Sequence, residues 1–327
     1  MKNQIKKKIA IANKNKIIFT AGPASLAAEN LNSLKPCFGR GDREYTSVEN
    51  FVLSKILKMS GQKKIARLQG SGSLAIEIMC LNLLNGKILI IDTGYYSDRI
   101  KTITKQSKKI NKEIKVVKSI DWKDMDKLNE KFDWIFACPT ETSCGLKIPI
   151  KDLYNLKKRL KAKLILDATG SFGLEENHKL ADALSFSSCK GLFGLTGACF
   201  ICFSTNIVNE IKSFYLNLNN HLDKKMTGPY HTIYSLFEIL KDYESFKYSV
   251  KQNKKIFLKK MKNYLTLPNK NQPLLCTHIN KIIYSNKKNV ILYQPRNNLY
   301  GSIVCHLGEV HLKRFSKGEI LDNLLVK

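Results

Sequence analysis

Apolar, β-branched runs alternate with segments of helical spacing along most of this chain, and this alternation constrains the fold more than any other feature. The runs predicted to be buried strands are residues 87–92, 114–117, 134–138, 164–167 and 183–187. The helical patterns between them cover residues 74–84, 96–111 and 150–160. Strands and helices that alternate in this way predict an α/β fold around a mostly parallel sheet.

The chain is expected to form two parts. Its 327 residues, 43% of them hydrophobic, allow a large core and exclude a disordered chain. We expect a large α/β domain over residues 15–225 and a smaller α+β domain over residues 226–327, with residues 1–14 packing on the smaller one. The last third is predicted to have a long helical stretch and then short strands, near residues 207–264, 281–285, 290–294 and 301–306.

The formal net charge of +28 raises the question of a nucleic-acid partner. Only seven of the 55 basic residues are Arg, the side chain that makes bidentate phosphate contacts, and the Lys residues are spread from end to end. Lysines on solvated faces explain this pattern better than nucleic-acid binding, although a non-catalytic basic binding protein stays open as an alternative.

Cysteine usage and hydropathy bear on the location of the protein. Nine Cys without regular spacing fit reduced thiols in the cytoplasm better than a disulfide framework. The longest weakly polar run, residues 191–203, is too short to span a bilayer, so we expect no membrane association. Cys199 and Cys202 should point to opposite faces of one strand, and we therefore expect no metal site.

A glycine- and serine-rich segment, residues 70–75, comes directly before the predicted helix 74–84. Small residues let the backbone approach an anion, and a helix N-terminus offers free N–H groups, so the segment predicts a phosphate cradle. It also matches a dinucleotide-binding fingerprint, with Asp92 about twenty residues later. That interpretation requires a strand before Gly70, and residues 65–69 form a poor strand pattern.

Two later strands end in residues that can carry chemistry. Asp167 ends one predicted strand, at the sheet edge where α/β proteins bind ligands. Lys190 follows the next strand among small residues, and a buried lysine loses its charge readily and can act as a nucleophile. Gly191, Gly194 and Gly197 suit a loop that wraps closely around a ligand.

A phosphate cradle, a strand-end Asp and a strand-end Lys in this order resemble the fold-type I pyridoxal-phosphate enzymes of class V. Within that class the chain is most similar to the 2-aminoethylphosphonate–pyruvate transaminase group. The resemblance covers most of the chain and is carried by residues 19–23, 68–77, 139–145, 167–173, 188–191, 227–232 and 308–310.

The resemblance implies a pyridoxal 5'-phosphate cofactor and a role for each matching residue. Lys190 would form the internal aldimine, and Asp167 would pair with the pyridine nitrogen. The other expected contacts are Ser71, Gly72 and Ser73 with the phosphate, Tyr96 and Thr169 with the two faces of the ring, Thr142 with its phenolic edge, Cys189 beside the lysine, Gly22 with the substrate, and Thr227 with the phosphate of a neighbouring subunit. The resemblance therefore also implies a homodimer with shared active sites.

The sequence departs from this family at two positions. Cys189 stands where the family has a residue that hydrogen-bonds well to the phosphate. Ile303 stands where the family has the Arg that binds the substrate carboxylate, and we expect Arg296 to take over that function, with His306 as the less favoured candidate. The predicted activity is amino transfer between a small amine, such as 2-aminoethylphosphonate or an amino acid, and an oxo acid such as pyruvate. The alternatives are a cysteine desulfurase or lyase of the same class and a nicotinamide-dependent oxidoreductase using residues 70–75.

Overall fold

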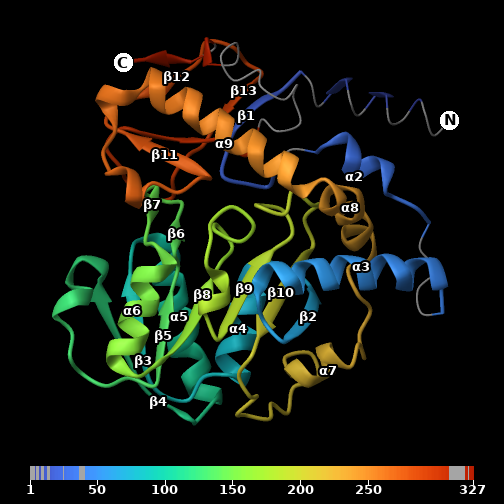
Figure 1. The fold of residues 1–327 in the computed structure, drawn as a ribbon, viewed down its shortest axis with the longest axis vertical. Coiled ribbons are helices and arrows are strands. Elements are labelled where there is room, and N and C mark those ends of the chain that lie inside the picture. Colours follow the sequence, from blue (N-terminus) through green and yellow to red (C-terminus); the bar gives the residue numbers. More distant parts are fainter. Residues whose placement is uncertain are drawn as a thin grey trace.

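The computed structural model describes residues 4, 7–8, 11–12, 15–24, 26–36, 41–308, 321–322 and 324–327. Seven strands form one central sheet in the order β2-β10-β9-β8-β5-β3-β4 (Figure 1). In that spatial order the strands are Lys64–Gln69, Ala198–Phe203, Ala183–Ser187, Lys163–Asp167, Trp134–Ala137, Gly86–Asp92 and Ile114–Asp121. Strand β10 is antiparallel to both of its neighbours, and the other neighbouring pairs are parallel. The predicted mostly parallel sheet is therefore confirmed.

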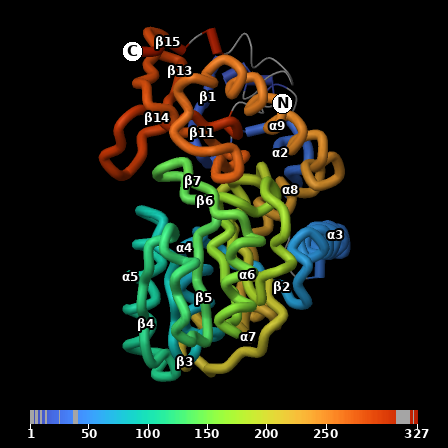
Figure 2. Tube along the Cα trace, turned by 60° about the vertical axis from the view of Figure 1, so that its left-hand side comes forward, coloured from blue at the N-terminus to red at the C-terminus, as the bar shows by residue number. Residues whose placement is uncertain are grey.

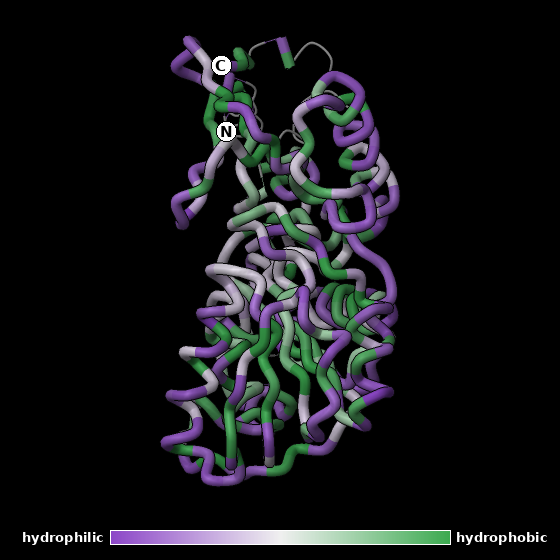
Figure 3. Tube along the Cα trace, turned by 90° about the vertical axis from the view of Figure 1, so that its left-hand side faces the viewer, coloured by the Kyte–Doolittle hydropathy of each residue, from purple (hydrophilic) through white to green (hydrophobic). Residues whose placement is uncertain are grey.

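Helices cover both faces of this sheet. One face packs against α4, α5 and α7, and the opposite face packs against α3, α6 and α8. The first three helices are α4 (Gly72–Asn82), α5 (Tyr95–Ile110) and α7 (Leu218–Leu222), and the other three are α3 (Arg43–Ser60), α6 (Ile150–Leu160) and α8 (Tyr230–Lys241). Neighbouring strand residues alternate between the two cores, as Ile90 and Ile91 do. Figure 3 shows the resulting pattern, in which hydrophobic strands lie inside the lower part of the molecule.

The sheet corrects one expectation from the sequence. Residues 65–69 were expected to be a poor strand, and they lie in β2, which forms an edge of the sheet and pairs only with β10. The charged residue that weakens the pattern is Arg67, which is buried and forms an ion pair with Glu49 of α3. The strand is completed by its pairing with β10, and the burial of Arg67 in it is offset by a tertiary charge pair that local propensity does not reveal.

The segment after β10 is less helical than its spacing indicates. Residues 207–217 contain no helix, and the helical stretch consists of α7, α8 and the longer helix α9 (Tyr243–Lys260). Cys199 and Cys202 are both buried in β10, and they belong to cores on opposite faces of the sheet. The expected opposite orientation of these two thiols is confirmed.

The C-terminal part lies against one end of the sheet, above the β6–β7 hairpin in Figures 1 and 2. Its strands and those of the hairpin are β11 Cys276–Ile279, β12 Ile283–Tyr284, β13 Val290–Leu292, β14 Ser302–Cys305, β15 Leu325–Val326, β6 Thr140–Glu141 and β7 Leu146–Lys147. Strand β11 was missing from the sequence expectations, whereas β12, β13 and β14 match them.

The N-terminal segment joins the C-terminal part. Strand β1 (Ile17–Phe19) pairs in parallel with β13, and Phe19 belongs to the same apolar core as Phe257 of α9. The short helix α2 (Ala28–Asn32) lies beside α8. The packing expected for residues 1–14 falls mostly outside the described residues, and the domain boundary at residue 225 stays a prediction.

Candidate active site

A cavity of about 440 Å³ lies where α4 begins and where β8 and β9 end. It brings together nine of the residues selected from the sequence: Ser71, Gly72, Ser73, Tyr96, Thr142, Asp167, Thr169, Cys189 and Lys190. These residues come from five separate stretches of the chain. The fold therefore collects most of the predicted site into one pocket.

The N-terminus of α4 forms one wall of this cavity. Ser71 is the N-cap residue of the helix, and its side chain makes no capping hydrogen bond. A side chain on Gly72 would place its Cβ 2.9 Å from the Thr169 hydroxyl, so only glycine fits this close approach. The first amides of a helix have no partner within the helix, and together with the Ser71 and Ser73 hydroxyls they can bind a phosphate.

Asp167 lies at the end of β8 and is 4% exposed. Its carboxylate accepts a hydrogen bond of 3.0 Å from the Thr169 amide, and it forms no ion pair within the described part of the chain. Burial raises the pKa of Asp167 above its usual range. A cationic ring nitrogen beside this carboxylate would supply the missing opposite charge.

Lys190 reaches the cavity from the loop after β9. Its ammonium lies 5.3 Å from the centre of the Tyr96 ring. Its side chain runs along Gly22, where an added Cβ would come within 2.9 Å of the Lys190 Cγ. Gly22 therefore lies next to the active site, in contact with the Lys190 side chain, although it does not line the cavity itself. The neighbouring Cys189 lines the cavity, and its backbone oxygen accepts a hydrogen bond from Ala24.

Two of the three glycines after Lys190 have a different function from the one expected. A Cβ on Gly191 would lie 2.2 Å from the Phe172 carbonyl oxygen, and one on Gly194 would lie 2.5 Å from Leu236. Both glycines allow close packing of protein against protein. Only Gly197 of the three lines the cavity.

Arg99 and Glu141 are site residues that the sequence analysis did not select. Arg99 of α5 lines the cavity, lies 3.3 Å from the Ser73 hydroxyl and stacks 5.0 Å from the centre of the Tyr96 ring. Glu141 is buried and accepts hydrogen bonds from the Tyr96 and Ser97 amides, which fixes the start of α5. Burial raises the pKa of Glu141. The spacing of three residues between Tyr96 and Arg99 on one helix face was the signal available in the sequence.

Three hydroxyl groups of the cavity lack a hydrogen bond of normal geometry, although Thr142 lies near the Tyr293 hydroxyl and Thr169 near the Asp167 carboxylate. The Oγ1 atoms of Thr140, Thr142 and Thr169 are buried and make no hydrogen bond of normal geometry with another described residue. Buried hydroxyls are normally satisfied, so these groups call for a polar ligand. A phosphorylated pyridine ring with oxygen substituents fits them, the helix N-terminus and the buried carboxylate.

Two of the predicted residues lie apart from the cavity. Thr227 lines a small separate pocket with Arg67, Tyr215 and Lys224. Arg296 is exposed, and its guanidinium lies 3.3 Å from the Tyr95 hydroxyl. The neighbouring Arg99 and Arg296 lower the pKa of this phenol.

The less favoured candidate for acid binding, His306, and Ile303, which stands in place of the family arginine, both lie in the C-terminal part. Ile303 is buried in β14 within an apolar core, so it cannot bind an acid. His306 is buried and hydrogen-bonded to Thr277, and residues 309–310, which carry part of the family resemblance, lie outside the described residues. Among the described residues, no group of acidic, His or Cys side chains is arranged to hold a metal ion.

Comparison with known proteins decides the family. The family model for class-V aminotransferases matches residues 44–225, which is more than half of the chain. The chain belongs to the class-V aminotransferases. It is a pyridoxal-phosphate-dependent aminotransferase with the fold-type I architecture expected from its sequence, and the nicotinamide-dependent alternative is wrong. The strand that the dinucleotide interpretation requires before Gly70 does exist, as β2. However, β2 and β3 are not neighbours in the sheet, so Asp92 at the end of β3 lies away from the strand before Gly70, and its carboxylate accepts a hydrogen bond from the Ser97 hydroxyl.

Similar proteins agree with this assignment. The 2-aminoethylphosphonate–pyruvate transaminase of Pseudomonas aeruginosa is 24% identical over 261 residues, which cover 72% of this chain and 70% of the relative. The transaminase of the same name from Cupriavidus taiwanensis is 22% identical over 68% of this chain and 66% of the relative. The structure of a Thermus thermophilus aspartate aminotransferase superimposes with a TM-score of 0.77 at 18% identity, over 94% of this chain and 100% of that chain.

Proposed function

We propose that this aminotransferase moves an amino group from a small amine with an acidic group, first of all 2-aminoethylphosphonate, to a small oxo acid such as pyruvate. The observation that carries the proposal is the single cavity that unites Lys190, Asp167 and the α4 N-terminus. The names of the similar enzymes support the substrate pair. Arg296, an exposed guanidinium 5.5 Å from the centre of the Tyr95 ring, supports an anionic substrate.

Different residues of the cavity would bind different parts of the cofactor. Ser71, Gly72, Ser73 and Arg99 would hold its phosphate, since they combine helix amides, hydroxyls and a guanidinium. Tyr96 would stack on one face of the ring and Thr169 would contact the other. Thr142 would donate its hydroxyl to the phenolic oxygen of the ring.

Lys190 and Asp167 would carry the chemistry. The bound cofactor supplies an electron sink that stabilises a carbanion on the substrate. Lys190 would hold the cofactor covalently, release it to the incoming amine, and then take a proton from the substrate carbon with its Nζ atom. Asp167 would keep its negative charge beside the ring nitrogen and hold that nitrogen protonated. Its buried position excludes water that would weaken this pair.

Arg296 would bind the acidic end of the substrate. It is exposed and reaches Tyr95, the neighbour of Tyr96 in the cavity wall. An exposed guanidinium can bind a carboxylate or phosphonate through two parallel hydrogen bonds. Gly22, which lies against the Lys190 side chain, would leave room for the substrate on the same side.

The assembly proposed here is a homodimer with shared active sites. Thr227 lies outside the cavity of its own chain, so its predicted contact with the phosphate requires a second subunit. Phe214 and Tyr215 of the neighbouring segment expose apolar surface, which a partner would cover. We also place the enzyme in the cytoplasm, because the eight described cysteines are all free thiols. Among the described helices, none has the length and apolar character of a membrane span.

A substrate panel tests the proposed reaction. The purified holoenzyme is incubated with 2-aminoethylphosphonate, alanine or 2-phenylethylamine as donor, and with pyruvate or glyoxylate as acceptor. We expect the highest kcat/KM for a donor with an acidic group. Turnover that is fastest with phenylethylamine, which has no acidic group, would contradict the proposed substrate class.

A further inference from the structure

A second cavity of about 460 Å³ lies beside the active site and is not part of it. The chain between β5 and α6 contributes to both: Thr140 and Thr142 line the catalytic cavity, whereas Pro139 and Lys147 line the second one. Its other walls come from residues 174–177, from α9 and from residues 269–274. The second cavity thus lies between the large α/β part and the C-terminal part. Its size is that of a small-molecule site.

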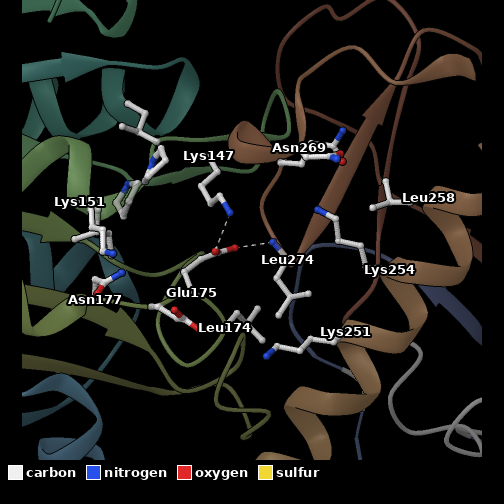
Figure 4. A pocket seen from close by; sticks show the side chains of 16 residues that line it. Lys147, Lys151, Leu174, Glu175, Asn177, Lys251, Lys254, Leu258, Asn269 and Leu274 are labelled. Atoms are coloured by element: carbon white, nitrogen blue, oxygen red, sulfur yellow. Dashed lines mark hydrogen bonds and ion pairs between the residues drawn. The ribbon is translucent and has the colours of Figure 1, made fainter. Parts of the chain in front are cut away.

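Positive charge dominates this second cavity. Four lysines line it (Lys147, Lys151, Lys251 and Lys254), against two glutamates (Glu175 and Glu176). Glu175 is occupied, because it accepts from Lys147 at 3.3 Å and from the Leu274 amide at 2.6 Å. Figure 4 shows Lys251 and Lys254 extending from α9 toward the side where Lys147 and Glu175 lie. A net positive charge therefore faces the space between these elements.

Lys254 is the unusual member of this group. Lys254 is 8% exposed. Its ammonium donates the one hydrogen bond described for it to the Pro273 carbonyl oxygen, at 2.5 Å. It forms no ion pair with any described carboxylate, and burial lowers its pKa to about 8. Burying a lysine without an ion-pair partner is costly, and Glu175, whose charge acts on Lys254, is already bonded to Lys147 and the Leu274 amide. An anion in the adjoining cavity would offset that cost.

A second, independent observation comes from Gln272. This residue is 4% exposed and lines the cavity, and its side-chain oxygen is buried without a hydrogen-bond donor in the described part of the chain. A ligand with a hydroxyl or ammonium group would satisfy it. Leu174, Leu258 and Leu274 add apolar surface. The ligand must therefore combine negative charge, a hydrogen-bond donor and a short carbon chain.

We infer that this cavity binds a small hydroxy- or amino-dicarboxylate, with its two carboxylates on Lys251 and Lys254 and its donor group on Gln272. Two separate cations match two carboxylates at the ends of a short chain better than the concentrated charge of a phosphate. The inference goes beyond the proposed reaction, because none of these residues lines the catalytic cavity. The ligand would link α9 to the 174–177 segment and stabilise their contact.

Calorimetric titration of the borohydride-reduced holoenzyme tests the inference, since the cofactor then stays in the active site. The probes are malate, succinate and inorganic phosphate, in a chloride-poor buffer. We expect one equivalent of malate to bind, more tightly than succinate because succinate cannot donate to Gln272. Phosphate should bind more weakly than either dicarboxylate.

Three variants of α9, together with Arg296→Ala, locate the bound probe. Lys254→Met and Lys251→Ala should each weaken malate binding by about tenfold or more, as expected for loss of a charge-assisted hydrogen bond. Lys251 is exposed, so its variant tests the inference even if Lys254→Met does not fold. Lys255→Ala is the matched control, because Lys255 is exposed on the same helix and does not line the cavity. Absence of malate binding, equal binding in all three variants, or loss of binding in Arg296→Ala alone would overturn the inference.

Discussion

Removing each of the two arginines that flank Tyr95 should separate cofactor binding from substrate binding. Arg99 is half-buried in the cavity wall and lies 3.3 Å from the Ser73 hydroxyl, within reach of the proposed phosphate position. Arg296 is exposed and contacts Tyr95 from outside the cavity. We expect Arg99→Ala to weaken cofactor binding, and Arg296→Ala to lower kcat/KM for an acidic substrate.

The magnitude follows from the contacts that each variant loses. A hydrogen bond to a charged group contributes about 1.5–3 kcal/mol, which corresponds to a change of roughly 10- to 150-fold in an equilibrium constant. Arg99→Ala should raise the dissociation constant of pyridoxal phosphate by that factor. Stacking of Arg99 on Tyr96, at 5.0 Å, adds to the loss. Arg296→Ala should lower kcat/KM by a similar factor and leave the cofactor dissociation constant within twofold of wild type.

The assay titrates apoenzyme with pyridoxal phosphate and follows the visible absorbance of the bound cofactor. Arg99→Lys is the matched control, because it keeps the charge and loses the planar geometry, so it should fall between wild type and alanine. Equal cofactor affinity in wild type and Arg99→Ala would refute the assignment of Arg99 to the phosphate. Undiminished kcat/KM in Arg296→Ala would show that Arg296 is only a surface residue.

Three further predictions concern stability, the ring partner and assembly. Glu49→Gln should lower the free energy of unfolding by about 3–5 kcal/mol in a chemical denaturation, because it leaves the Arg67 guanidinium buried without its ion-pair partner. The control Glu44→Gln removes an exposed ion pair and should lower it by under about 1 kcal/mol. Equal losses in the two variants would contradict this prediction. Asp167→Asn should lower kcat by roughly 10- to 150-fold, and an unchanged kcat would exclude the ring-nitrogen contact. A mixture of inactive Lys190→Ala and Thr227→Ala chains should regain activity through heterodimers, and a fully active monomer in sedimentation would refute shared sites.

Acid should weaken the interactions of Glu49 with Lys224, Tyr45 and Arg67, because the structure lowers the pKa of this carboxyl. Burial alone would raise the pKa of Glu49, but hydrogen bonds from Lys224, Tyr45 and Arg67 outweigh it and hold the pKa below its usual value of 4.5. A carboxyl with a lowered folded-state pKa stabilises the protein above the unfolded value, and the contribution is lost as the pH falls through the folded value. The difference in stability between wild type and Glu49→Gln should therefore shrink below about pH 4.5.

The sequence predicted the parts of this enzyme that depend on local pattern and on motif order. Strand Ala183–Ser187 and helix Ile150–Leu160 were predicted to the residue, because the strand consists of small and apolar residues that can all be buried and the helix has a clear apolar stripe. Asp167 and Lys190 follow strands of a parallel sheet, and such ends meet at one edge. Their meeting in one cavity could therefore be expected before the structure was known.

What the sequence missed depends on contacts between distant segments. Strand β2 pairs with the distant strand β10, and its buried Arg67 bonds to Glu49, eighteen residues away on another element. Glu141 reaches the start of α5 across 45 positions of the chain, and no local pattern indicates it. Strand β11 is short and follows an irregular segment, and it is completed by pairing with β14. Long-range partners of this kind are not encoded in local spacing.

The most direct test of the account is to find which lysine carries the cofactor. The purified enzyme, loaded with pyridoxal phosphate, is reduced with borohydride and digested, and the modified peptide is identified by mass spectrometry. The account predicts loss of the visible absorption band and a single modified residue, Lys190, which is the lysine that lines the catalytic cavity. No stable modification would contradict the account. So would modification of Lys254, whose pKa is lowered to about 8 in the second cavity.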